Sequence, residues 1–428
     1  MTSRRDARSL IADPPAYTFH DATLRSRPLL ALNHIGRALA ALGLELPSLS
    51  TESILTAAKK RAGESDLGGD SYREPLERYL DAVRAEADLN TFGRIALREM
   101  LVGSLANRIQ LAAWARDHPK VRDEKIDEPW VILGLPRTGT SLLSILLGLD
   151  PHSRALMHWE GAHPVPPPTL ADAAEDARIA KNAAELAGLL KLNPALGAMH
   201  PFGATIAQEC VALFMYDIRT LGVETQAYVP SYGRWLQSCD MAPAYAQHKL
   251  ALQTLQSTQP TGRWVMKTPN HLWCLDTLLD FYPDARVIWT HRDPGRVTTS
   301  LASLVNSLQG MFTHRTDPKL VADEWLGKSE HAIRSGMEFD SRAPAGWCEH
   351  IRYVDLIDDP IGTVRKVYAR YGEEVSPLHE RRMQVWLEGR GQDAAGRHVY
   401  DPADFGWSYP ALAERFRDYQ ERYDVPVE

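Results

Sequence analysis

The sequence predicts an α/β protein in which a mostly parallel sheet is covered by helices, with a helical region in front of it. Beyond about residue 125, the short apolar runs WVILG, WVMKT, ARVIWTHRDP and HIRYVDL alternate with helical patterns, which is typical of strands in a parallel sheet. Earlier in the chain, Leu101, Leu105 and Ile109 recur near helical spacing. We therefore expect a helical N-terminal region at residues 1–125 and an α/β domain at residues 126–428, with the polar stretch HPKVRDEKIDEP at the boundary.

The composition is that of an ordinary globular protein. The chain has 428 residues, of which 44% are hydrophobic and 24% charged, and a net charge of −7. A mildly acidic total gives no reason to expect nucleic-acid binding. The longest apolar run, LLSILLGL, is too short for a transmembrane segment, and the N-terminal stretch has no apolar core for export. Four widely spaced cysteines without a C-x-x-C pair indicate free thiols, so we expect a cytoplasmic protein.

Helix starts in the α/β part are marked by Asp-Pro pairs. Asp can cap a helix and Pro suits its first position. Asp293-Pro294 predicts a helix that ends at Gly310, and Asp359-Pro360 predicts one that ends at Gly372.

The stretch GLPRTGTS, residues 134–141, has the frame of a phosphate-binding loop between an apolar strand and an apolar helix. Its glycines permit a tight turn, and its N–H groups and hydroxyls can surround an anion. The usual lysine is replaced by Thr140, and the basic residue is Arg137. A basic strand-to-helix turn without a ligand is the alternative. The candidate anion-binding residues are Arg137, Thr138, Gly139, Thr140 and Ser141.

A second strand, turn and helix, ARVIWTHRDPGRVTTSLASL, carries another candidate site. Arg292 lies in the turn, and Ser300 follows eight residues later, about two helical turns on. Taken alone, Arg292 could cap carbonyl groups and Ser300 could be solvated. Together with the first loop, they predict a second phosphate clamp.

These segments resemble the sulfotransferases that use 3'-phosphoadenosine 5'-phosphosulfate (PAPS). GLPRTGTS is similar to their 5'-phosphosulfate loop, HRDPGRVTTS to their 3'-phosphate segment, and WVMKTPNH to the strand that carries a lysine, here Lys267. Two C-terminal stretches, YVDLIDDPIGTVRKVYARYG and GRHVYDPADFGW, resemble the bacterial branch, so the likeness covers roughly residues 126–410.

The resemblance implies a fold like that of the P-loop nucleotide kinases and PAPS as the donor substrate, without a metal. Arg137 and Lys267 would neutralise the transferring group. Arg292 and Ser300 would bind the 3'-phosphate, and Arg397 is a further candidate for that contact.

Three residues are candidates for the general base that deprotonates the acceptor hydroxyl. His271 lies four residues after Lys267, but the letters TPN separate it from the family position. Glu160 follows a predicted second strand, and Glu209 lies in a predicted helix, TIAQECVALFMYD. We favour Glu160, with His271 as the next candidate.

The sequence thus favours a sulfotransferase that moves a sulfuryl group from PAPS to a hydroxyl of a small-molecule, lipid or carbohydrate acceptor. A kinase-type phosphotransferase of the same fold is one alternative, and magnesium dependence would separate the two. A non-catalytic nucleotide-binding protein is another, with the helical region as its interaction module. The expected partners are the nucleotide donor and an acceptor; a homo-oligomer is possible.

Overall fold

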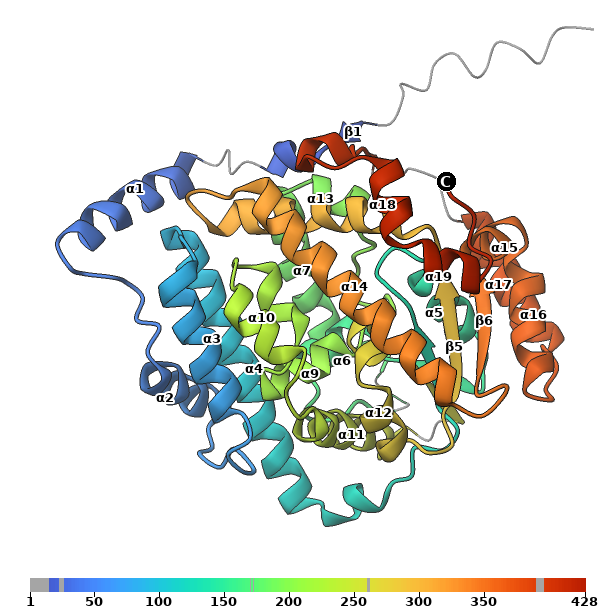
Figure 1. Cartoon of the computed structure of the whole chain (residues 1–428). Coiled ribbons are helices and arrows are strands. Elements are labelled where there is room, and N and C mark those ends of the chain that lie inside the picture. The colour runs from blue at the N-terminus through green and yellow to red at the C-terminus, as the bar shows by residue number, and fades with distance from the viewer. Residues whose placement is uncertain (1–14, 23–26, 170, 172, 260–261, 390–395) are drawn as a thin grey trace, which may run out of the picture.

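The computed structural model describes residues 15–22, 27–169, 171, 173–259, 262–389 and 396–428. Its centre is a five-stranded, fully parallel sheet in the order β3-β4-β2-β5-β6 (Figure 1). The strands are β2 (Trp130–Leu133), β3 (Ser153–Ala155), β4 (Arg263–Lys267), β5 (Arg286–His291) and β6 (Cys348–Arg352).

Both faces of the sheet are buried, which explains the continuous apolar runs of its strands. Trp130 and Ile132 of β2 belong to one hydrophobic cluster, and Val131 and Leu133 belong to another on the opposite side. The helices of the α/β part are α5 (Thr140–Gly148), α6 (His158–Ala162), α7 (Ala177–Leu192), α8 (Ala195–Met199), α9 (Val211–Phe214), α10 (Pro230–Leu236), α11 (Ala242–Gln256), α12 (Leu275–Phe281), α13 (Pro294–Phe312), α14 (Pro318–Arg342), α15 (Tyr353–Asp358), α16 (Pro360–Arg370), α17 (Pro377–Gly389), α18 (Tyr409–Arg415) and α19 (Arg417–Arg422).

Helices α5, α16 and α17 cover the first face of the sheet, and α11 to α14 contribute to the cluster on the second. The long α14 runs across the front of the molecule in Figure 1. Along the chain, β2 is followed first by β3 and β4, which lie on one side of it in the sheet, and then by β5 and β6, which lie on the other side. The carboxyl end of β2 is therefore the point where the strand order reverses, and this is where open parallel sheets bind ligands.

The described part of the N-terminal region contains four α-helices, α1 (Arg27–Ala41), α2 (Thr51–Ala62), α3 (Arg73–Glu86) and α4 (Thr91–Asp117). Side-chain caps begin α2 and α4, because Ser50 accepts the N–H of Ser53 and Asn90 accepts the N–H of Gly93. One hydrophobic cluster continues from α2, α3 and α4 to the sheet. The expected boundary near residue 125 thus lies within one continuous core.

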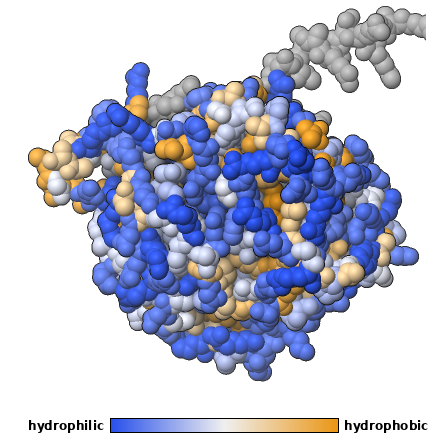
Figure 2. Space-filling view, viewed as in Figure 1, coloured by the Kyte–Doolittle hydropathy of each residue, from blue (hydrophilic) through white to orange (hydrophobic). Residues whose placement is uncertain are grey.

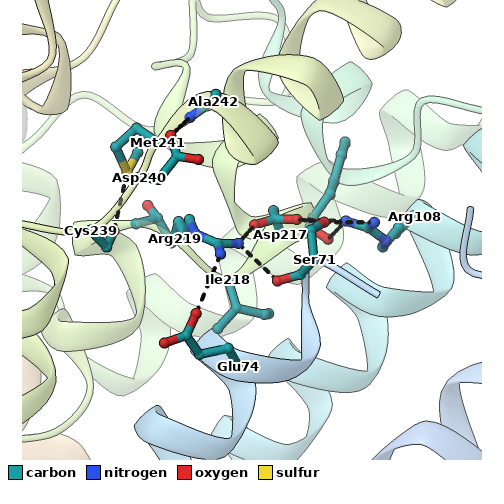
Figure 3. A network of polar contacts seen from close by, with 12 residues as sticks. Ser71, Glu74, Arg108, Asp217, Ile218, Arg219, Cys239, Asp240, Met241 and Ala242 are labelled. Atoms are coloured by element: carbon teal, nitrogen blue, oxygen red, sulfur yellow. Dashed lines mark hydrogen bonds and ion pairs between the residues drawn. The ribbon is translucent and has the colours of Figure 1, made fainter. Parts of the chain in front are cut away.

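A buried ionic network also joins the two parts. Arg108 of α4 donates to Asp217 at 2.8 Å, and neither side chain is more than 1% exposed. Arg219 and Ser71 also donate to Asp217, and Arg108 donates to the carbonyl oxygen of Leu67 at 2.8 Å. Figure 3 shows Asp217 between the two guanidinium groups. Such a network holds only while each charge keeps its partners, so it fixes α4 against the segment that follows α9.

The first helix, α1, differs from α2, α3 and α4, because none of its residues is buried. Its last turn leads into exposed Leu42, Leu44 and Leu46, and this end of the molecule is the apolar projection at the left of Figure 2. Among the helices described here, none is long and apolar enough to cross a membrane.

Three local predictions need correction. The helix expected to end at Gly310 continues to Phe312, because Gly310 does not adopt the left-handed conformation that ends a helix, unlike Gly372. The strand expected over HIRYVDL ends at Arg352, and α15 begins directly after it. The helix expected around Glu209 forms only from Val211, so Glu209 lies in the irregular segment before α9.

Candidate functional site

The loop of residues 134–141 connects β2 to the N-terminus of α5 and curls tightly. Gly134 and Gly139 have φ values of 145° and 88°, and Arg137 between them has a φ of 72°. A Cβ atom on Gly134 would lie 2.5 Å from Thr290 Oγ1, and one on Gly139 would lie 2.9 Å from a methyl carbon of Leu356. Only glycine fits these two positions, so the backbone N–H groups of the loop stay free to face a bound anion.

The hydroxyl of Thr138 holds the loop in place. It donates to the carbonyl oxygen of Leu135 at 2.7 Å and lies 2.7 Å from the hydroxyl of Thr290 on β5. Thr138 is buried. Any contribution of Thr138 to an anion site would therefore come from its backbone N–H, whereas Thr140 and Ser141 stand in the first turn of α5.

Arg137 joins the loop to the second candidate segment. Its Nε donates to Ser300 Oγ at 3.2 Å, and its Nη1 donates to the carbonyl oxygen of Met199. Burial lowers the pKa of Arg137, nearby Tyr400 opposes that shift, and Arg292 adds to it. The structure thus brings Arg137, Ser300 and Arg292 into one electropositive cluster, although Ser300 is 163 residues and Arg292 is 155 residues from Arg137 in the sequence.

Arg292 binds a carboxylate. Its Nε and Nη2 donate to the two oxygens of Glu428 at 2.8 and 2.7 Å, and its Nη1 donates to the carbonyl oxygen of Arg137 at 3.1 Å. The guanidinium carbon lies 4.0 Å from the ring centroid of Tyr353. The backbone of Glu428 is also held, because its N–H donates to Asp293 at 2.9 Å and its carbonyl oxygen accepts from Arg296 at 2.9 Å. This is the forked geometry with which arginine binds carboxylate or phosphate.

Lys267 stands at the end of β4, beside the loop. Its Nζ donates to Ser141 Oγ at 3.0 Å and to Glu209 Oε1 at 2.7 Å, and the side chain is only 2% exposed. The same Glu209 oxygen lies 3.9 Å from His200 Nε2. Burial would raise the pKa of Glu209, but Lys267 and His200 together lower it to about 2. Glu209 is therefore ionised at neutral pH and forms a compact pair with the lysine.

The other two base candidates occupy different surroundings. Glu160 is buried, and its carboxylate accepts from Arg154 and, at 2.9 Å, from the N–H of Met157. His271 is fully buried among aromatic rings, where its Nδ1 lies 2.7 Å from the hydroxyl of Tyr245. Burial first, and then His248, hold the pKa of His271 well below its usual range. Neither residue has a direct contact with Lys267 among the interactions of the described residues.

The segment after residue 395 closes over Arg137 and α13. His398 Nε2 lies 2.8 Å from Ser303 Oγ, and burial followed by the charge of Arg137 lowers the pKa of His398 to about 3. Arg397 itself is exposed, and its N–H donates to the carbonyl oxygen of Pro15 at 2.8 Å in the pairing of β1 (Ala16–Tyr17) with β7 (Arg397–His398). Its expected role at the 3'-phosphate stays a prediction.

Two residues of this site had no local signal in the sequence. Glu428 reaches Arg292 across 136 residues of chain, and His200 is an isolated histidine between α8 and the loop that follows. Within the described part of the chain, no three His, Cys, Asp or Glu side chains are grouped so that they could hold a metal ion.

A glycine-containing loop at the switch point of a parallel sheet, with three cationic side chains close by, is the arrangement expected of an enzyme that transfers a charged group. The model of the sulfotransferase family matches residues 129–377, and the chain belongs to that family of enzymes. The expected fold class and enzyme class are thereby confirmed.

Solved structures agree with this assignment. Sulfotransferase STF9 from Mycobacterium avium is 29% identical with a TM-score of 0.82, and the match covers 90% of this chain and 99% of that one. Sulfotransferase STF1 from Mycobacterium tuberculosis H37Rv is 28% identical with a TM-score of 0.78, over 86% of this chain and 98% of that one. A sequence comparison with curated proteins gave no match.

Proposed function

We propose that this enzyme transfers a sulfuryl group from PAPS to an acceptor hydroxyl without a metal ion. One observation carries the proposal: Lys267 Nζ bridges the phosphate loop, at Ser141, and the carboxylate of Glu209. A buried cation between an anion-binding loop and a carboxylate is what a transfer of a negatively charged group to a hydroxyl requires.

The residues present fit such a donor. The tight loop around Gly134 and Gly139 suits the 5'-phosphosulfate, and so does the N-terminus of α5. The forked contact of Arg292 with Glu428 indicates that this arginine can bind an oxyanion, and the 3'-phosphate is the group of PAPS that ATP lacks. Ser300 and Arg292 would hold that phosphate, while Arg137, Lys267 and the loop N–H groups would face the transferring group.

The reaction forms a bond from the acceptor oxygen to sulfur and breaks the bond from sulfur to the phosphate, so the hydroxyl proton must go to a base. Lys267 and Arg137 would stabilise the negative charge that develops in this step. In many phosphate loops a lysine reaches the terminal phosphates of a triphosphate. Thr140 stands at that position in this chain. This substitution supports sulfuryl transfer over the kinase alternative.

We propose Glu209, rather than Glu160 or His271, as the base. Its carboxylate contacts Lys267 directly at 2.7 Å and is ionised, whereas both oxygens of Glu160 have structural partners. The low pKa of Glu209 makes it a weak proton acceptor while Lys267 is paired with it. An anion on the loop side of Lys267 would draw the ammonium charge away and raise the pKa of Glu209 towards the value that base catalysis needs.

Transfer of a radiolabelled sulfuryl group from PAPS to 4-nitrophenol or a simple glycoside, measured with excess chelator present, tests the function. We expect full activity under chelation. Loss of activity on chelation, with recovery when magnesium is restored, would favour the phosphotransferase alternative instead. The cytoplasmic location also stays a proposal; it is supported by four unpaired cysteines, three of which are buried.

A further inference from the structure

A cavity of about 1060 Å³ lies between the N-terminal helix α4 and the α/β part. Its walls come from three places: the middle of α4, the helices α6 and α7, and the segment 202–226 around α9. Helices α4, α6, α7 and α9 lie near one another in the middle of Figure 1. The volume is at the upper end of what small-ligand sites reach, so the cavity has room for a ligand larger than a single sugar ring.

The cavity comes close to the segment that carries the proposed base, although Glu209 itself is not among the lining residues. Gln208 and Val211 line it and flank Glu209 in the sequence. Phe202 lines it as well, and its ring centroid lies 5.3 Å from that of His200, whose Nε2 is 3.9 Å from Glu209. A ligand in this cavity would therefore lie next to the segment of Glu209, and its reacting end would have to extend beyond the lining to meet the carboxylate that pairs with Lys267.

The charged residues of the cavity are at its rim and balance one another. Arg61 and Glu99 form an ion pair at 2.6 Å with both side chains exposed, and Lys181 and Glu185 are exposed on α7. Two positive and two negative groups leave no net charge to attract an ionic acceptor.

Apart from these charged groups, the lining combines apolar side chains, such as Leu186 and Met215, with uncharged amides and hydroxyls. Ser104, Asn107 and Gln110 come from α4, and Asn182, Gln208 and Gln226 come from the other walls. The Oε1 atom of Gln226 is buried and has no hydrogen-bond partner within the described residues. A buried acceptor without a donor is costly, and rotation of the Gln226 amide towards the cavity that this residue lines would let a ligand hydroxyl supply that donor.

We infer that this cavity binds an uncharged, polyhydroxylated acceptor of the glycoside type. The inference rests on the proposed function, because it names the acceptor of that reaction. The amides would bind sugar hydroxyls, and Phe202 would pack against a ring face next to the reacting hydroxyl. The N-terminal helical region thereby supplies one wall of the acceptor site through α4.

Two glycines provide a matched pair of variants. Gly103 of α4 lines the cavity, and a Cβ atom added there would meet only Arg61 Nη1, at 3.7 Å, so a larger side chain can extend into the open space. Gly188 of α7 is outside the cavity lining, and a Cβ atom there would meet nothing within 4 Å. Gly103→Met should fill the cavity, whereas Gly188→Met makes the same chemical change on an exposed helix face.

The test measures binding of octyl β-D-glucopyranoside, octyl β-D-glucuronide and 1-octanol by calorimetry in the presence of saturating adenosine 3',5'-bisphosphate. We expect the neutral glycoside to bind most tightly, at least tenfold weaker binding in Gly103→Met, and unchanged binding in Gly188→Met. Gln226→Leu, as a second variant, should weaken the glycoside about tenfold without affecting octanol.

Tighter binding of the glucuronide or of octanol, or glycoside binding that Gly103→Met and Gln226→Leu both leave intact, would overturn the inference. Affinity for adenosine 3',5'-bisphosphate, measured on the same variants, separates the two proposals. If the bisphosphate binds normally while the glycoside does not, the acceptor assignment fails and the sulfotransferase function stands. If the wild-type chain does not bind the bisphosphate, the function itself fails.

Discussion

Glu428 forms an ion pair with Arg292, the arginine that we assign to the 3'-phosphate. The negative charge of Glu428 should therefore weaken binding of the donor. The two oxygens of Glu428 lie 2.8 and 2.7 Å from Arg292, and a phosphate that binds the same fork must displace them. Glu428→Gln keeps the size of the side chain and removes its charge. We therefore expect this variant to bind adenosine 3',5'-bisphosphate more tightly than the wild type.

The magnitude follows from the geometry and the exposure of the pair. The contact is bidentate, but 17% of the Arg292 side chain and 26% of the Glu428 side chain are exposed, so solvent screens part of the interaction. Replacing a charge-assisted contact of this kind by a neutral one should release about 0.5–1.5 kcal/mol. This corresponds to an affinity gain of about twofold to tenfold.

Calorimetric titration of the wild type, Glu428→Gln and the control Glu421→Gln is the assay, since Glu421 is exposed on α19. Adenosine 5'-phosphate, which has no 3'-phosphate, should bind all three proteins alike. Arg292→Ala should weaken the bisphosphate about tenfold to a hundredfold, and adding Glu428→Gln to it should then bring no gain. Equal strengthening of both nucleotides, or weaker bisphosphate binding in Glu428→Gln, would refute the assignment of Arg292.

Three further expectations concern the base, acid stability and the buried network. Glu209→Gln should lower turnover by about 10²–10⁴ with donor affinity nearly intact, and an acidic phenol should rescue it in part; normal turnover, with loss in Glu160→Gln, would return the role to Glu160. The lowered pKa of Glu209 stabilises the fold at neutral pH, and this contribution is lost as the pH falls towards about 2. Lys267→Met should therefore be less stable than the wild type at pH 7, and the difference in urea unfolding should shrink below about pH 4; a difference independent of pH would contradict the pairing. Asp217→Ala leaves Arg108 buried without its carboxylate and should cost about 3–5 kcal/mol in the same assay, whereas a loss below about 1 kcal/mol would show that the network contributes little.

The convergence of the candidate donor-binding residues was largely predictable, because its signals are local. The glycines of the loop, the Asp-Pro helix start at residue 293 and the apolar runs of the strands act over a few neighbouring residues. Parallel strands also have their carboxyl ends at one edge, so Arg137, Lys267 and Arg292 had to converge there. The structure accordingly joins Arg137 to Ser300 at 3.2 Å and Lys267 to Ser141 at 3.0 Å.

The choice among the base candidates was not predictable in this way. Glu160 and Glu209 are both acidic residues near the ends of predicted elements, and no local pattern states which carboxylate faces Lys267. The carboxylate that faces Lys267 is that of Glu209. Glu209 lies before α9, in an irregular segment that the sequence pattern predicted to be helical. It lies 58 residues from its lysine partner.

The sequence by itself determined the class of fold, the order of the candidate phosphate-binding segments and the family, because backbone conformation and helix capping depend on neighbouring residues. Only the tertiary structure decided what those segments contact: the carboxylate of Glu428 on Arg292, the pairing of Glu209 with Lys267, and the cavity wall formed by α4. These contacts join residues far apart in the chain and depend on how helices pack over the sheet, which the periodicity of a sequence does not encode.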